Sequence, residues 1–83
     1  MKRRDLLRHL TAAPPPGRAL LTDREIEIVR VLAQGRTNAE IAAELFLASG
    51  TVKNHVAVIQ RKLGVRNRVG IAAWAWDNGV AHR

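Results

Sequence analysis

Residues 37–64, TNAEIAAELFLASGTVKNHVAVIQRKLG, decide the fold. Their opening Thr-Asn-Ala-Glu is the pattern of a capping box, in which a threonine and a glutamate satisfy the first amides of a helix. A short helix follows, then a turn at 46–48, then a longer helix that begins near Ser49 or Gly50 and closes at Gly64. Both helices repeat apolar residues at helical spacing: Ile41, Ala42 and Leu45 in the first, and Val52, Val56, Ile59 and Leu63 in the second. Two helices joined by a brief turn predict a helix-turn-helix unit.

A further helix is predicted on each side of this unit. Upstream, a second capping box precedes a helix over 23–34, which Gly35 ends. Downstream, Asn67 can cap a helix over 68–78. No segment alternates apolar and polar residues with period two, so no strand is expected. The predicted fold class is all-α, a compact four-helix helix-turn-helix domain with a basic N-terminal extension.

The outer helices carry the remaining core candidates. The upstream helix is expected to bury Ile26, Val29, Leu32 and Ala33. The downstream helix has its apolar positions at Val69, Ala72, Ala73 and Trp76. Trp74 and Trp76 are two residues apart and cannot share one side of a helix, so only one should enter the core. We expect that one to be Trp76.

The first nineteen residues differ from the rest in composition. Residues 2–13 predict a short basic amphipathic helix, and the run Pro-Pro-Pro-Gly at 14–17 predicts a stiff linker, because proline holds the backbone extended. We therefore expect residues 1–19 to form an extension with a proline-rich linker and residues 20–83 to form the helix-turn-helix domain.

The distribution of charge points to an anionic partner. Fourteen Lys and Arg stand against seven Asp and Glu, which gives a net charge of +7. The stretch 46–76 contains no carboxylate at all, and its bases are Lys53, Arg61, Lys62, Arg66 and Arg68. A long segment with one sign of charge is a patterned surface rather than a random solvated one.

Several classes of protein are disfavoured. The chain has no cysteine, which excludes disulfides and thiolate metal sites and fits a cytoplasmic location. No apolar run approaches the roughly 20 residues that span a bilayer, so no membrane partner is expected. His55 has no second metal ligand at suitable spacing. Without a nucleophile and base, paired carboxylates or a glycine-rich phosphate loop, we expect neither an enzyme nor a bound metal or cofactor.

The outer arc of the longer helix carries side chains suited to reading DNA. A helical wheel sets Asn54, Ala57, Val58 and Arg61 opposite the apolar stripe, with Lys53 on one shoulder. Asparagine pairs with adenine, lysine and arginine reach guanine, and small apolar side chains touch the thymine methyl. The alternatives stay open here. Asn54 could be merely solvated, Ala57 merely a good helix former, and His55 a core-edge or phosphate-contacting residue.

Five separate segments resemble the LuxR/NarL helix-turn-helix family of bacterial transcription regulators, in the family's order and spacing over about residues 20–80. They are LTDRE at 21–25, AQG at 33–35, NAEIA at 38–42, GTVKNHV at 50–56 and RKLGVRNR at 61–68. The resemblance implies sequence-specific binding of double-stranded DNA by the output domain of a response regulator or related regulator. An upstream sensory module, a homodimer on DNA and contact with RNA polymerase are further implications.

The resemblance also assigns residues. It implies that the third helix reads bases through Lys53, Asn54 and Ala57. We add Val58 to these on its position in the outer arc. Phosphate contacts are expected from Thr51, Arg61, Lys62, Arg66 and Arg68, and the fourth helix is expected to form the dimer through Val69, Ala72, Ala73 and Trp76.

Three positions depart from the family pattern. Ala39 replaces a frequent lysine, so one backbone contact from the second helix is missing. Ala48 replaces a common serine or threonine, so either Ser49 caps the third helix or that helix starts elsewhere. Asn67 replaces a serine, which is harmless because asparagine is an equally good cap.

Two alternative functions were weighed. One is a promoter-recognition domain of a sigma factor, whose four-helix output region is built similarly. The other is a protein-interaction module that grips a partner with the fourth helix and its tryptophans, the basic patch being incidental.

Overall fold

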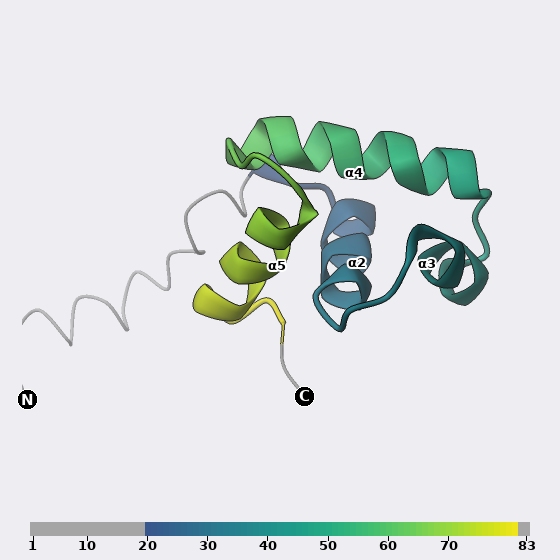
Figure 1. Cartoon of the computed structure of the whole chain (residues 1–83), viewed down its shortest axis with the longest axis horizontal. Helices are drawn as coiled ribbons and strands as arrows, with labels where there is room; N and C mark the ends of the chain where they lie inside the picture. Colours follow the sequence, from purple (N-terminus) through teal and green to yellow (C-terminus); the bar gives the residue numbers. More distant parts are fainter. Residues whose placement is uncertain (1–19, 82–83) are drawn as a thin grey trace, which may run out of the picture.

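Four helices make up the part of the chain that the computed structural model describes, residues 20–81 (Figure 1). They are α2 (Asp23–Leu32), α3 (Asn38–Leu45), α4 (Ser49–Leu63) and α5 (Arg68–Asp77). No strand occurs in this range, so the predicted all-α class is confirmed. The helix predicted at 2–13 and the linker at 14–17 lie outside the described residues.

The predicted caps account for where the helices begin. In α2, Thr22 Oγ1 accepts a hydrogen bond from the Glu25 amide at 3.1 Å, while Glu25 Oε1 accepts from the Thr22 amide at 2.8 Å. Thr37 and Glu40 repeat this arrangement at α3 with the same distances. Both reciprocal pairs satisfy amides that a helix end leaves without partners.

The other two helix starts resolve the departures noted above. Asn67 Oδ1 accepts from the Gly70 amide at 3.2 Å, so the expected asparagine cap of α5 is confirmed. At α4 the cap residue is Ala48, which offers no side-chain hydrogen bond, and Ser49 is already the first helical residue. The helix start has therefore not shifted, and it is left without a side-chain cap.

α2 is the central helix of the domain, since it contacts α3, α4 and α5. Ile26, Val29, Leu32 and Ala33 are buried as predicted, and Ile28 and Val31 are buried as well because neighbours cover α2 on more than one side. In Figure 1, α4 lies across the other three helices. The most deeply buried side chains are Ile28, Val29, Ile41, Val52, Ile59, Ile71 and Val80.

The prediction for the tryptophans was wrong. Trp76 is 45% exposed, and its indole Nε1 donates to the Ala33 carbonyl at 3.1 Å, so its ring lies at the surface beside the end of α2. Trp74 is the half-buried ring that packs against the core. The buried face of α5 is instead defined by Ile71 and Ala75, one helical turn apart.

The start of α5 passes unusually close to the loop that follows α4. A Cβ atom added at Gly70 would lie 2.7 Å from Val65 Cβ, a distance that real Cβ atoms do not reach. A glycine inside a helix normally weakens it by about 1 kcal/mol relative to alanine. Here its lack of a side chain allows the close approach.

Gly70→Ala is therefore expected to lower the free energy of unfolding, although alanine is the better helix former. We expect a net loss of about 1–2 kcal/mol, because overpacking costs about 1–3 kcal/mol and exceeds the propensity gain. Thermal denaturation followed by circular dichroism measures the change. The matched control is Gly50→Ala in α4, where an added Cβ meets nothing within 4 Å. Equal stability of the two variants would show that Val65 does not constrain Gly70.

Candidate nucleic-acid interface

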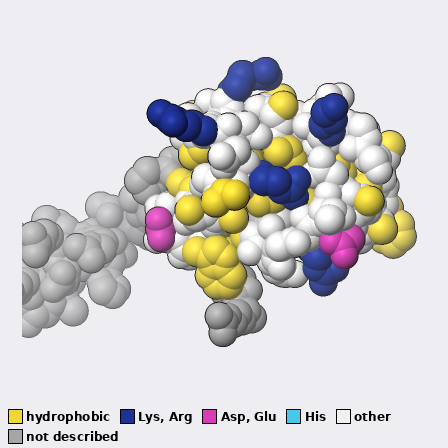
Figure 2. Space-filling view, in the orientation of Figure 1, with side chains coloured by type: hydrophobic (Ala, Val, Ile, Leu, Met, Phe, Trp, Pro, Cys, Tyr) yellow, Lys and Arg dark blue, Asp and Glu magenta, His cyan; other side chains and the backbone are white. Residues whose placement is uncertain are grey.

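The outward side of α4 holds most of the predicted DNA-contacting residues. Val52, Val56 and Ile59 are buried against the other helices, which fixes how α4 is turned. The residues fully exposed on its outer side are Thr51, Lys53, Asn54, Ala57 and Arg61, while Val58 and His55 are half-buried. Lys and Arg side chains stand along the edge of the molecule over α4 in Figure 2. The helical wheel therefore predicted the orientation of this helix correctly.

The outer side of α4 is low in its middle. Gly50, Asn54, Ala57 and Arg61 follow one another at spacings of four, three and four, so they line a single stripe. A glycine, an asparagine and an alanine in succession let the helix backbone come close to a flat surface. The longer cations Lys53 and Arg61 flank or end this stripe. Such a profile suits the floor and walls of a DNA major groove.

The first turn of α4 is electrostatically open. It has no side-chain cap and no acidic residue in its first turn. The unpaired amides and the helix dipole leave partial positive charge at this end, which favours an anion such as a phosphate. The missing cap at Ala48 thus leaves the start of the exposed helix favourable to negative charge.

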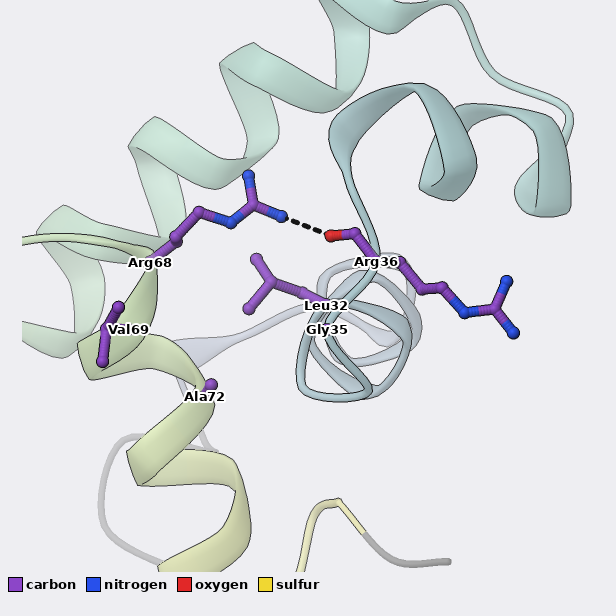
Figure 3. A pocket seen from close by; sticks show the side chains of 6 residues that line it. All are labelled: Leu32, Gly35, Arg36, Arg68, Val69 and Ala72. Carbon is purple, nitrogen blue, oxygen red and sulfur yellow. Dashed lines mark hydrogen bonds between the residues drawn. The ribbon is translucent and has the colours of Figure 1, made fainter.

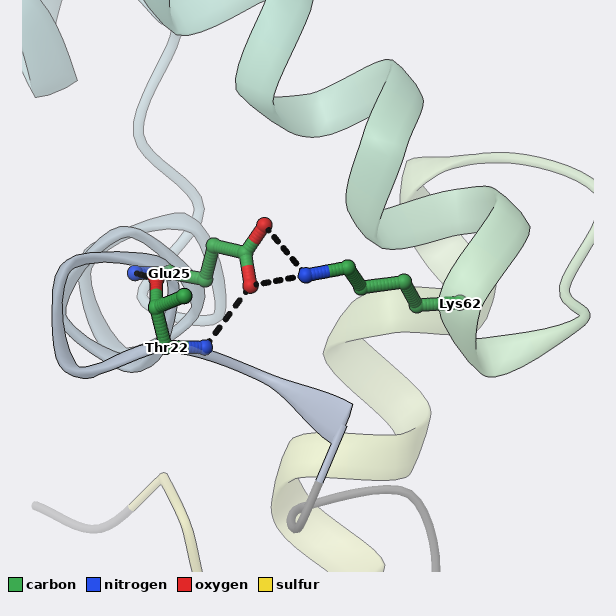
Figure 4. A network of polar contacts seen from close by, with 3 residues as sticks. All are labelled: Thr22, Glu25 and Lys62. Atoms are coloured by element: carbon green, nitrogen blue, oxygen red, sulfur yellow. Dashed lines mark hydrogen bonds and ion pairs between the residues drawn. The ribbon is translucent and has the colours of Figure 1, made fainter.

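Lys62 has a structural partner that the sequence did not reveal. Its Nζ lies 2.8 Å from Glu25 Oε1 and 3.1 Å from Glu25 Oε2 (Figure 4), so the ion pair ties the end of α4 to the capping box of α2. The Glu25 side chain is only 5% exposed and that of Lys62 33%. Lys62 was expected to meet a phosphate, but here its ammonium is already engaged within the domain.

Glu25 remains ionised because its partners outweigh its burial. Burial by itself would raise the pKa of this carboxyl, but hydrogen bonds from the Lys62 ammonium and the Thr22 amide hold the pKa below its ordinary value of 4.5. The folded-state pKa is thus the lower of the two. The stabilisation it contributes is present above the unfolded-state value and is lost as the pH falls through the folded-state value.

Lys62→Met should destabilise the domain, because it leaves a buried carboxylate without its cation while keeping an apolar stem of similar length. We expect a loss of about 1–3 kcal/mol at pH 7, measured by urea denaturation. The difference from the parent chain should shrink below about pH 4, where Glu25 becomes protonated in both. The control is Arg61→Met, an exposed cation on the same helix, with an expected change of about 0.5 kcal/mol or less. Equal losses in both variants would refute the structural role of Lys62.

Arg68 also binds within the domain. Its Nη1 donates to Asn38 Oδ1 and its Nη2 to the Arg36 carbonyl, both at 2.7 Å (Figure 3), so it joins the start of α5 to the start of α3. It was expected to contact phosphate. The residue that sequence reasoning missed is Asn38, which looked only like the first residue of a helix and lies 30 positions away. Arg66 stays exposed on the loop between α4 and α5.

A shallow hollow lies between α5 and the end of α2. It has a volume of about 250 Å³ and is lined by Leu32, Gly35, Arg36, Arg68, Val69 and Ala72 (Figure 3). Val69 is 70% exposed beside it, and the exposed Ala73 and Trp76 continue along α5. The four residues predicted for a dimer surface are therefore all on the outside of α5 or at its edge.

Comparison with known proteins identifies the family. The model of the family described as "Bacterial regulatory proteins, luxR family" matches residues 19–75. The chain belongs to the luxR family. This confirms the resemblance read from the sequence, and with it a DNA-binding, transcription-regulating domain rather than an enzyme. It also favours the regulator over the sigma-factor alternative.

Individual relatives agree with this membership. The chain is 42% identical to the transcriptional regulatory protein LnrK of Bacillus subtilis over 81 residues, 96% of the chain and 37% of LnrK. It is 49% identical over 49 residues to the spore germination protein GerE of the same organism, 59% of the chain and 66% of GerE. It thus spans little more than a third of LnrK.

A solved structure shows the same fold. The LuxR-type domain superposes on Escherichia coli SdiA with a TM-score of 0.71 and 34% identity, over 82% of this chain and 28% of SdiA. Within residues 20–81, none of the helices has both the length and the apolar character that crossing a membrane requires.

Proposed function

We propose that this LuxR-type domain binds paired half-sites in double-stranded DNA as a homodimer, with α4 of each copy in the major groove. The observation that carries the proposal is the outer side of α4, whose low central stripe is flanked by cations and faces away from the core. In a helix-turn-helix unit the second helix enters the groove while the first crosses the backbone.

Base reading falls to the centre of this stripe. Asn54 can make a bidentate pair with adenine, and Ala57 with the half-buried Val58 can contact a thymine methyl. Lys53 reaches either a guanine or a phosphate. With no bulky side chain between them, these residues address about three to five base pairs per half-site.

Phosphate contact falls to the exposed cations at the ends of α4. We assign it to Arg61 and Arg66, together with Thr51 and the open first turn of the helix. Lys62 and Arg68 are left out of this set, because Glu25, Asn38 and the Arg36 carbonyl already engage them. Their role is to hold α4 and α5 in place.

Self-association falls to the outer side of α5. Val69, Ala72, Ala73 and Trp76 follow at helical spacing, and the small alanines allow two helices to approach closely. The hollow beside Val69 offers room for a side chain of the second copy. A two-fold pair through this helix sets the recognition helices about one DNA turn, roughly 34 Å, apart.

The domain is proposed to serve as the output of a larger cytoplasmic regulator. The curated relatives are longer, and the relative of Streptomyces coelicolor that is 51% identical over 49 residues is named response regulator RamR. A response-regulator output with an upstream sensory module, acting on RNA polymerase, follows from this likeness and from the basic, DNA-facing α4.

Selection of bound sites from random duplex DNA tests the proposal. The chain should enrich a two-part site whose halves are centred about one helical turn apart. Fluorescence anisotropy should then show binding to the enriched duplex at least roughly 10³-fold tighter than to a shuffled one. Enrichment of nothing beyond background, without polymerase present, would contradict the proposal.

A further inference from the structure

The outer side of α3 is unlike the rest of the domain surface near the DNA. Ala39 and Ala43 are exposed one turn apart on it, and Phe46 follows at its C-terminal cap with 94% of its surface exposed. We call these three residues the α3 stripe. Apolar side chains gather at the edge of the molecule over α3 and the following turn in Figure 2.

Phe46 is the unusual member of the α3 stripe. Its backbone is left-handed, with φ 58°, a conformation that glycine or asparagine adopts readily and a bulky residue does not. Its ring is not part of the core. Neither the backbone geometry nor the packing within residues 20–81 therefore accounts for a phenylalanine at this turn.

The charges beside the α3 stripe identify the kind of partner. Glu40 and Glu44 are exposed next to it, and α3 contains no Lys or Arg. The cation that the structure sets near them is Arg36, 3.8 Å from Glu44 on the open surface. Two carboxylates and no cation repel a phosphate backbone. This face therefore fits a protein that presents basic side chains around an apolar contact.

We propose that the α3 stripe with Glu40 and Glu44 docks a basic protein surface of the transcription machinery, an RNA polymerase holoenzyme on the adjacent promoter. This rests on the proposed function, because α3 lies beside the DNA only when α4 occupies the groove. A protein that itself binds promoter DNA carries the Lys and Arg that the carboxylates require. An arginine can also stack on the exposed ring of Phe46.

The test uses the chain on a duplex that carries the selected site upstream of a promoter. Purified bacterial RNA polymerase holoenzyme is added, and the promoter complex is measured by gel shift and by transcript yield. Phe46→Asn, which suits the left-handed backbone, and Glu44→Lys should bind DNA within twofold of the parent chain. Both should lose at least fivefold of polymerase recruitment. The matched controls are Leu20→Asn, an exposed apolar residue, and Glu27→Lys, an exposed acid of α2; both should recruit like the parent.

The outcomes separate the two proposals. If the parent chain recruits no polymerase, or if Phe46→Asn and Glu44→Lys recruit as well as the parent, the docking surface is refuted while the DNA proposal stands. Loss of recruitment only in proportion to loss of DNA binding refutes it as well. If the parent chain does not bind the duplex, the proposed function fails, and the docking surface with it.

Discussion

Replacing Asn54 by alanine is expected to weaken binding to the selected duplex by about 1–3 kcal/mol, roughly 5- to 150-fold, with little effect on random DNA. Asn54 is exposed near the middle of the outer stripe of α4, where its amide can donate and accept toward an adenine. An alanine removes both hydrogen bonds and keeps the helix. Because random duplexes rarely offer that adenine, their affinity should barely change.

The comparison for Asn54→Ala is Arg61→Ala on the same exposed side. An arginine that meets a phosphate contributes alike to every sequence, so Arg61→Ala should weaken selected and random duplexes by the same factor. Anisotropy titrations of both variants on both duplexes give the four constants needed. Equal losses for Asn54→Ala on the two duplexes would mean that Asn54 reads no base and that α4 is turned differently in the groove.

A glutamate at Ala73 is expected to abolish cooperative binding to a duplex with two half-sites. Ala73 is exposed on the outer side of α5 between Val69 and Trp76, so the substitution leaves the core untouched. Across a two-fold axis it brings two like charges together and separates the small faces of the helices. A typical coupling between two sites is about 1–3 kcal/mol, so affinity for the double site should fall about 5- to 150-fold.

Binding of Ala73→Glu to a single half-site should remain within about twofold of the parent chain, because α4 is unchanged. The matched control is Ala43→Glu, an exposed alanine on α3 that should keep full cooperativity. Stoichiometry titrations on one-site and two-site duplexes, with light scattering of the free protein, report both parts. Persisting cooperativity in Ala73→Glu would move the dimer contact away from α5.

Local features of this fold could be predicted because local chemistry determines them. A threonine and a glutamate three residues apart satisfy each other's amides wherever they occur, so the starts of α2 and α3 were predicted correctly. The ends of α2 and α5 differ from the predictions by one or two residues, within the usual fraying of helix ends. The outward side of α4 followed from the spacing of its buried valines.

Features that join distant parts of the chain could not be predicted. Lys62 and Glu25 are 37 positions apart, and each has a sufficient local explanation, as a surface cation and as a capping residue. The choice between Trp74 and Trp76 likewise depended on where the end of α2 lies, since the Ala33 carbonyl accepts from Trp76. Helical periodicity within α5 contains no information about that neighbour.

The salt dependence of affinity tests the central claim, that the exposed cations of α4 and its following loop form a DNA footprint. With Lys53, Arg61 and Arg66 on phosphates, the log of the association constant should fall with the log of salt with a slope of about −2.7 per protomer. Arg66→Ala should reduce that slope by about 0.9, and Lys62→Met should leave it unchanged. A nearly flat dependence for the parent chain on its selected duplex would contradict the account.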